Sequence, residues 1–129
     1  MPNALLSIVD DDESIRRTTV RLLESFDFRA AAFDSAESFL QSPLLAETSC
    51  LIVDIQMPGM NGLELQRQLA AAGHRIPIIF VTAYGDRETR RRAVQGGAVA
   101  FLAKPFGDDL LLNSIQSALD VGKSPADPG

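Results

Sequence analysis

The stretch Leu-Ile-Val-Asp-Ile-Gln-Met-Pro-Gly-Met-Asn-Gly, residues 51–62, decides the fold that we expect for this chain. Three apolar residues lead directly into Asp54, and turn-forming residues interrupt the chain at Pro58, Gly59 and Gly62. A short apolar run that ends in a turn is typical of a strand buried on both faces of a parallel sheet. Asp54 then lies at the carboxyl end of that strand, where open α/β sheets bind their ligands. Packing explains a carboxylate there poorly, so we predict that Asp54 carries the chemistry of the protein.

Length and composition favour one compact domain. The chain has 129 residues, enough to bury about two thirds of the surface of the unfolded chain. Hydrophobic residues make up 46% of the chain and the net charge is −5, a balance that disfavours direct binding to nucleic acid or to anionic membranes. The single cysteine, Cys50, cannot form an internal disulfide, and no apolar run is long enough to cross a membrane. We therefore expect a cytoplasmic protein.

Apolar runs alternate with segments of helical periodicity along the chain. Strands are predicted at residues 5–9, 28–33, 50–53, 77–81 and 99–103, the second of them near a sheet edge. Helices are predicted after the acidic run at residues 10–13, from 34 towards 43, and at 62–73, 86–95 and 108–120. Strands and helices that alternate at short spacing form βαβ units with right-handed crossovers. The expected architecture is therefore a doubly wound α/β fold with a parallel sheet.

The acidic run at residues 10–13 exceeds what helix capping needs. Aspartate is a favoured N-cap, and acidic side chains suit the positive end of the helix dipole. One cap uses one acid, however, so the run leaves carboxylates for another task. By contrast, the Asp-Ser-Ala-Glu sequence at residues 34–37 resembles a capping box and predicts structure only.

The helix at residues 86–95 has little to bury. It carries four arginines but only Ala93 and Val94 as apolar anchors, so we expect it to be the most weakly held element. Beyond the last helix the composition is that of a linker. We place the domain at residues 1–121 and a linker-like tail at residues 122–129.

Four of the predicted strands end in polar or charged residues. These residues are Asp10 with Asp11, Asp54, Thr82 and Lys104. The carboxyl ends of parallel strands lie on one edge of the sheet, so these side chains should meet in one crevice. Several carboxylates together need a positive partner, and a set of oxygen ligands suits Mg²⁺. A lysine and a hydroxyl opposite the metal could bind a phosphoryl group, so we infer metal-assisted phosphoryl transfer onto Asp54.

The ordered set of motifs resembles the receiver domain of two-component response regulators. The set consists of Asp10-Asp11, Asp54 with Met57-Pro58-x-Met60-x-Gly62, Thr82-Ala83, and Lys104-Pro105-Phe106. The resemblance extends from residue 5 to about residue 119, and the sequence of residues 97–106 looks closest to that of FixJ-like transcriptional regulators. The resemblance implies a flavodoxin-like five-stranded sheet of order 2-1-3-4-5, and a cis peptide bond between Lys104 and Pro105.

The resemblance also implies a role for each site residue. Asp54 would accept a phosphoryl group from a sensor histidine kinase or a small phosphodonor. Asp11, Asp54 and the backbone carbonyl of Gln56 would bind Mg²⁺, and Asp10 would orient the metal through water. Thr82 and Lys104 would bind the phosphoryl oxygens. Phe101, with Thr82, would act in the conformational switch.

A phosphorylation-dependent homodimer is the further implication. Arg87, Arg91 and Phe101 would lie in its interface, although a solvated arginine face explains the same residues without any partner. Glu88 and Arg92 have the spacing of a helical ion pair. DNA would be reached only through an effector domain absent from this chain, and no membrane partner is expected.

Three other functions remain open at this stage. A single-domain regulator without a DNA-binding output fits the same residues, as does a receiver-like binding module that is never phosphorylated. A phosphatase of the haloacid-dehalogenase kind also uses a nucleophilic aspartate, but it leaves the loop after Asp54 unexplained. We expect a phosphoacceptor switch that slowly loses its own phosphoryl group rather than an enzyme that turns over a substrate.

Overall fold

A computed structural model describes residues 4–83 and 85–123 of the chain. Five strands are present: β1 (Leu5–Val9), β2 (Arg29–Phe33), β3 (Thr48–Asp54), β4 (Ile78–Thr82) and β5 (Ala100–Ala103). Between and after them lie the helices α1 (Glu13–Ser25), α2 (Ala36–Leu40), α3 (Gly62–Ala71), α4 (Arg87–Gln95) and α5 (Asp108–Lys123). A short 3₁₀ helix, η1 (Pro43–Glu47), was not expected from the sequence.

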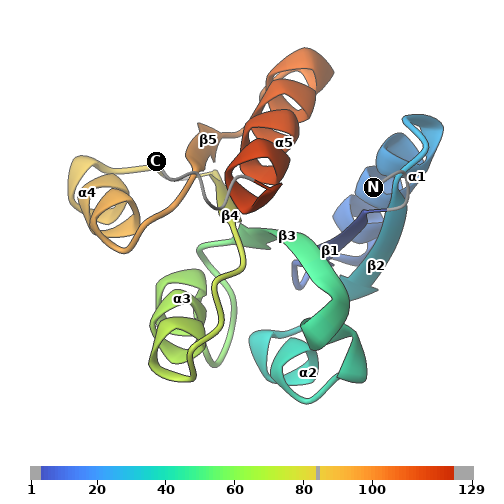
Figure 1. The fold of residues 1–129 in the computed structure, drawn as a ribbon. Helices are drawn as coiled ribbons and strands as arrows, with labels where there is room; N and C mark the ends of the chain where they lie inside the picture. Colours follow the sequence, from blue (N-terminus) through green and yellow to red (C-terminus); the bar gives the residue numbers. More distant parts are fainter. Residues whose placement is uncertain (1–3, 84, 124–129) are drawn as a thin grey trace.

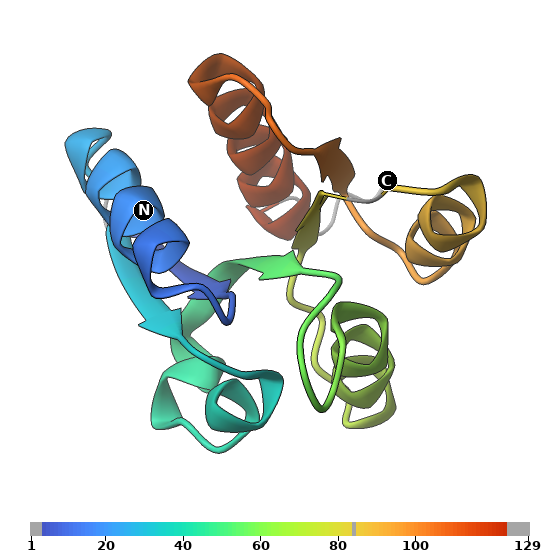
Figure 2. The same ribbon diagram turned by 180° about the vertical axis from the view of Figure 1, so that it is seen from behind.

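The strands form one parallel sheet in the order β2-β1-β3-β4-β5. Helices α1 and α5 cover one face of the sheet, and α2, α3 and α4 cover the other (Figures 1 and 2). Both the doubly wound architecture and the 2-1-3-4-5 order are confirmed. The edge position of β2 is confirmed as well.

The middle of the central strand β3, residues 50–53, is apolar because both faces of the strand are buried. Side chains alternate between the two faces of a strand, so successive residues of β3 enter different cores. Leu51 and Val53 pack with α2, α3 and α4, whereas Cys50 and Ile52 pack with α1 and α5. Each fully buried side chain of this kind contributes roughly 1.5–3 kcal/mol.

Three helix starts show how the local sequence fixes the elements. Asp12 is the N-cap of α1, and Oδ1 of Asp12 accepts the backbone N–H groups of Ser14 and Ile15. A complete capping box joins Asn61 and Glu64 at the start of α3. The capping box predicted at residues 34–37 is wrong. The N-cap of α2 is Ser35, which places the glutamate one position too early to close a box.

Helices α4 and α5 differ in detail from the prediction. In α4 only Ala93 is buried, whereas Val94 is 58% exposed and anchors nothing. Helix α5 continues to Lys123, so the first two residues of the predicted tail are helical, and residues 124–129 lie outside the described part of the chain. Within the described residues, no helix combines the length and the apolar character that a membrane span requires.

Candidate functional site

The polar residues at the strand ends meet on one edge of the sheet. Asp10 follows the last residue of β1, Asp54 is the last residue of β3, and Thr82 is the last residue of β4. Lys104 directly follows β5, and its backbone N–H donates to the carbonyl of Thr82 at 2.8 Å. Parallel pairing places these positions side by side, as the register of β3 with β4 and of β4 with β5 shows. The predicted convergence is confirmed.

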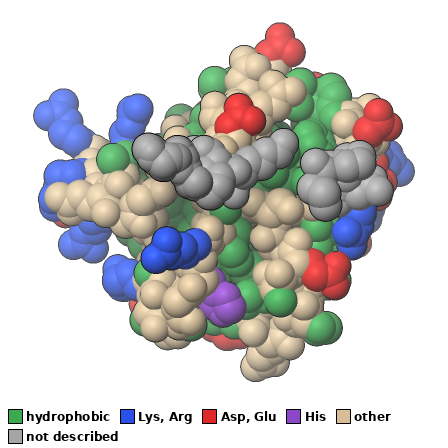
Figure 3. All heavy atoms as spheres, in the orientation of Figure 1, with side chains coloured by type: hydrophobic (Ala, Val, Ile, Leu, Met, Phe, Trp, Pro, Cys, Tyr) green, Lys and Arg blue, Asp and Glu red, His purple; other side chains and the backbone are tan. Residues whose placement is uncertain are grey.

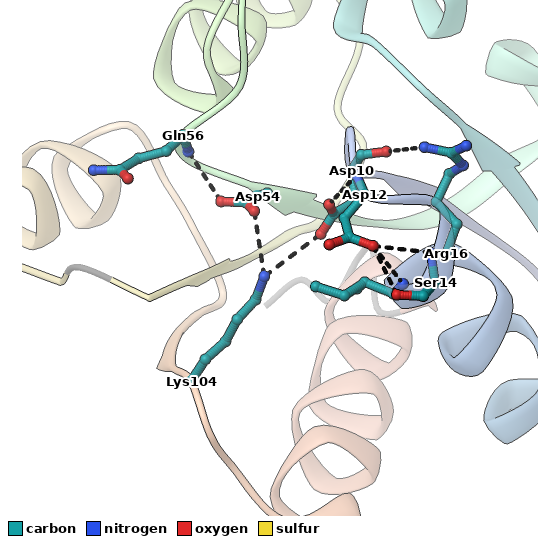
Figure 4. A network of polar contacts seen from close by, with 8 residues as sticks. Asp10, Asp12, Ser14, Arg16, Asp54, Gln56 and Lys104 are labelled. Atoms are coloured by element: carbon teal, nitrogen blue, oxygen red, sulfur yellow. Dashed lines mark hydrogen bonds and ion pairs between the residues drawn. The ribbon is translucent and has the colours of Figure 1, made fainter.

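Three carboxylates and one lysine form the centre of this edge. One oxygen each from Asp10, Asp11 and Asp54 lies within 4.8 Å of the other two. Lys104 Nζ lies 3.3 Å from Oδ2 of Asp54 and 3.5 Å from Oδ2 of Asp10 (Figure 4). A single ammonium group therefore stands between two buried carboxylates, and Asp11 is exposed at the side of the cluster.

Asp10 is the most deeply buried carboxylate of the cluster. Burial raises the pKa of this carboxyl, while the backbone N–H of Asp12, which donates to Oδ1 at 2.9 Å, and the charge of Lys104 oppose that rise. Its Oδ2 atom is buried and has no hydrogen-bond partner among the described residues. A buried carboxylate oxygen that pairs with Lys104 at 3.5 Å but accepts no hydrogen bond, in a group of three carboxylates, fits a hard divalent cation that takes oxygen ligands. The donor set therefore fits the predicted Mg²⁺.

The loop after β3 holds Asp54 in place. The N–H of Gln56 donates to Oδ1 of Asp54 at 2.9 Å, and the amide side chain of Gln56 points away from the carboxylate (Figure 4). The N–H of Gly62 donates to the carbonyl of Ile55 at 3.0 Å. A methyl group on Gly62 would lie 2.8 Å from the carbonyl oxygen of Asp54, so only glycine permits this close approach.

Two supporting side chains were missed by the sequence analysis. Arg16 in α1 donates from Nη1 to the carbonyl oxygen of Asp10 at 2.8 Å. Glu37 in α2, which was assigned to a capping box, instead accepts the N–H of Met60 at 3.2 Å. Both bonds join separate loops or elements, and no local sequence signal indicates them.

Asp12 does not belong to the cluster. Its carboxylate is occupied at the start of α1, so Asp10 and Asp11 are the members of the acidic run that meet Asp54. Of the three aspartates at residues 10–12, only Asp10 and Asp11 therefore bring a carboxylate to the site. A phosphatase of the haloacid-dehalogenase kind would match its acidic pair to Asp10 and Asp12 of the sequence Asp10-x-Asp12, and the capping role of Asp12 argues against it.

Phe101 lies within the edge strand β5, two residues before the strand ends. It is half-buried in β5, paired in register with Phe80 of β4. A methyl group on Gly85 would lie 2.9 Å from Cε1 of Phe101, so the ring lies against the loop between β4 and α4. Thr82 at the start of that loop is fully buried.

The arginines of α4 are exposed at the surface. Arg87 and Arg91 are exposed, and Figure 3 shows basic side chains gathered on the side of the molecule where α4 lies. Glu88 contacts Arg91 at 2.6 Å and Arg92 at 3.1 Å, so the predicted Glu88–Arg92 pair is confirmed. These exposed pairs contribute little to stability.

Known proteins resemble this chain along most of its length. The model of the response regulator receiver domain family matches residues 6–116. Nodulation protein W of Bradyrhizobium diazoefficiens is 44% identical over 117 residues, which cover 91% of this chain and 52% of that protein. The chain spans about half the length of the curated relatives that it matches.

Solved structures agree with the sequence matches. The response regulator StyR superposes with a TM-score of 0.88 and 41% identity, over 95% of this chain and 62% of that chain. The crystal structure of FixJ-N superposes with a TM-score of 0.84 and 34% identity, over 93% of this chain and 96% of that chain.

Proposed function

This chain belongs to the response regulator receiver family of two-component systems, and on that premise we propose that it is a phosphoacceptor switch whose acceptor is Asp54. The observation that carries the proposal is the contact of Asp54 with Lys104 at 3.3 Å, beside the carboxylates of Asp10 and Asp11. The phosphodonor would be the phosphohistidine of a sensor histidine kinase or a small acyl phosphate.

Mg²⁺ is the cofactor that the acidic cluster would hold. Asp11, Asp54 and the carbonyl of Gln56 would be its ligands, with Asp10 acting through water. When bound, the ion supplies positive charge that offsets the carboxylates and the charge of the phosphoryl oxygens. The Oδ2 atom of Asp10 supports this assignment, because it accepts no hydrogen bond among the described residues and a cation or its bound water would add a second polar contact to the ion pair with Lys104.

In the proposed transfer, Asp54 is the nucleophile. A carboxylate oxygen of Asp54 attacks the phosphorus, the bond from phosphorus to the donor breaks, and the donor leaves with the electron pair. Gln56 orients the carboxylate of Asp54 through the backbone N–H that it donates to Oδ1. Lys104 and the hydroxyl of Thr82 would then bind the phosphoryl oxygens. Each molecule accepts one phosphoryl group and loses it slowly, so the chain is a switch and not a turnover enzyme.

The output is the second half of the proposal. Binding of the phosphoryl group by Thr82 would move the loop between β4 and α4, against which Phe101 packs. Arg87 and Arg91 on α4, with Phe101, would then form a homodimer interface. Control of transcription through a DNA-binding effector domain is supported by the curated relatives, several of which are transcriptional regulators of about twice this length. A single-domain regulator without DNA-binding output would use the same switch.

Intact-mass measurement tests the acceptor. The protein is incubated with acetyl phosphate, with and without Mg²⁺, alongside Asp54→Asn and the control Asp34→Asn, an exposed aspartate outside the cluster. We expect one added phosphoryl group in the wild type and in the control, only with Mg²⁺, and none in Asp54→Asn. An adduct that persists in Asp54→Asn would refute the proposal, and continuous turnover of the donor would favour a phosphatase.

A further inference from the structure

A buried side-chain hydrogen bond joins α3 to the C-terminal end of α4. Gln66 of α3 is only 6% exposed, and its Nε2 donates to the carbonyl oxygen of Ala93 at 3.1 Å. A buried amide that loses its partner destabilises a folded protein. This bond therefore constrains where the last turn of α4 can lie relative to α3.

Backbone geometry reinforces the constraint. The carbonyl of Ala93 also accepts the N–H of Ala98 at 3.0 Å, and the N–H of Gly97 donates to the carbonyl of Val94 at 3.0 Å. With Gly97 at a φ of 96°, these bonds form a Schellman termination of the helix. Gly96 lies directly against the amide of Gln66, because a methyl group there would lie 2.5 Å from Cδ of Gln66.

The N-terminal end of α4 is held differently. Asp86 accepts the N–H of Thr89 at 2.7 Å, which is a bond within the helix start and not to another element. Arg87, Glu88 and Arg90 are exposed, and the only buried residue of α4 is Ala93, at the other end. Among the residues that the structure describes, no side chain of another element therefore holds the N-terminal end of α4 as Gln66 holds the far end.

We propose that Gln66 is a positioning residue that fixes the C-terminal end of α4, so that α4 pivots about this end when the loop after Thr82 changes conformation. The anchor depends only on the contacts described above, whereas the pivot rests on the proposed phosphoacceptor function. Gln66 touches no reacting atom. It determines which end of the helix transmits the signal.

Amide hydrogen exchange of the unphosphorylated protein tests the anchor. Gln66→Met keeps the length of the side chain and removes the donor, and Gln68→Met makes the same change at an exposed position of the same helix. We expect Gln66→Met to speed exchange at residues 96–98 about fivefold, the effect of losing one ordinary hydrogen bond, with less change at residues 90–92. Equal exchange at residues 96–98 in the two variants would overturn the anchor.

A second variant, Gly96→Ala, tests the anchor in case Gln66→Met does not fold. Gly96 has a φ of −80°, which alanine adopts readily, so Gly96→Ala displaces the glutamine amide without deleting it. We expect the same faster exchange at residues 96–98.

Phosphorylation of the wild type tests the pivot. Exchange should change more at residues 90–92 than at residues 96–98, and the reverse order would refute the pivot. Because the anchor is measured without a phosphodonor, its result is separate from the intact-mass result. A chain that accepts no phosphoryl group would refute the proposed function and the pivot together, and would leave the measured anchor standing.

Discussion

Substitution of Gly62 by alanine should displace the backbone of Asp54, the proposed phosphoacceptor. The added methyl group would lie 2.8 Å from the carbonyl oxygen of Asp54, where ordinary contact begins at 3.4 Å, so the two segments must separate by about 0.6 Å. Ile55 Cα at 3.1 Å and Phe80 Cε1 at 3.2 Å prevent the methyl group from turning aside. The shift therefore acts on Asp54 and on the loop that holds its carboxylate.

The expected losses follow from this displacement. Overpacking of this kind destabilises a fold by about 1–3 kcal/mol. For a domain of this size the midpoint of thermal unfolding falls by roughly 3–5 °C per kcal/mol. A misplacement of 1 Å can slow a reaction about a hundredfold, so a shift of about half that size should slow phosphorylation of Asp54 by roughly tenfold.

The assay compares Gly62→Ala with Gly107→Ala. A methyl group on Gly107 meets no atom within 4 Å, so this control should retain the midpoint and the rate of the wild type. Phosphorylation is followed by intact mass over time with acetyl phosphate and Mg²⁺, and stability by thermal unfolding. If the two variants phosphorylate at the same rate, the close approach of Gly62 to Asp54 does not control the site and the reasoning fails.

The further predictions concern three single side chains. Burial raises the pKa of the Cys50 thiol to about 12, so the native protein should resist a thiol reagent near neutral pH that labels the unfolded chain fully. Since the folded thiol keeps its proton longer, its contribution to stability should be lost between pH 9.0 and about 12, seen as a falling unfolding midpoint absent from Cys50→Ala. The N–H of Thr89 lowers the pKa of Asp86, so this cap is lost as the pH falls through the folded pKa. The Thr89 amide shift should titrate in acid in the wild type and stay constant in Asp86→Asn. Phe80→Ala should lose about 3–5 kcal/mol in urea unfolding, and a loss under about 1 kcal/mol would contradict the packing of this ring in the core.

The sheet and the acidic cluster could be predicted from sequence because both depend on strand positions. An apolar run followed by a polar residue marks the carboxyl end of a buried strand, and parallel pairing brings such ends together without knowledge of any side-chain contact. Asp10, Asp54 and Lys104 were found in this way. The capping of α1 by Asp12 resolved what the acidic run alone left ambiguous.

The supporting bonds could not be predicted because they depend on distances between segments far apart in sequence. Glu37 has the sequence context of a helix cap, yet its carboxylate reaches Met60 on another loop. Gln66 is a polar residue on the otherwise apolar buried face of α3. Its burial is explained only by the hydrogen bond that it donates to the carbonyl of Ala93. A local pattern sets the element, whereas the tertiary arrangement sets the partner of a polar side chain.

The energy of the proposed switch cannot come from Lys104 alone. Converting a population from 1:99 to 99:1 requires about 5.5 kcal/mol of differential stabilisation. A hydrogen bond to a charged group contributes about 1.5–3 kcal/mol, but Lys104 already pairs with Asp54 and Asp10 at rest and gains only the difference when a phosphoryl oxygen replaces a carboxylate. The remainder must come from groups that make new contacts or from an element that costs little to move. We expect this element to be helix α4, which buries one side chain and is anchored at its far end.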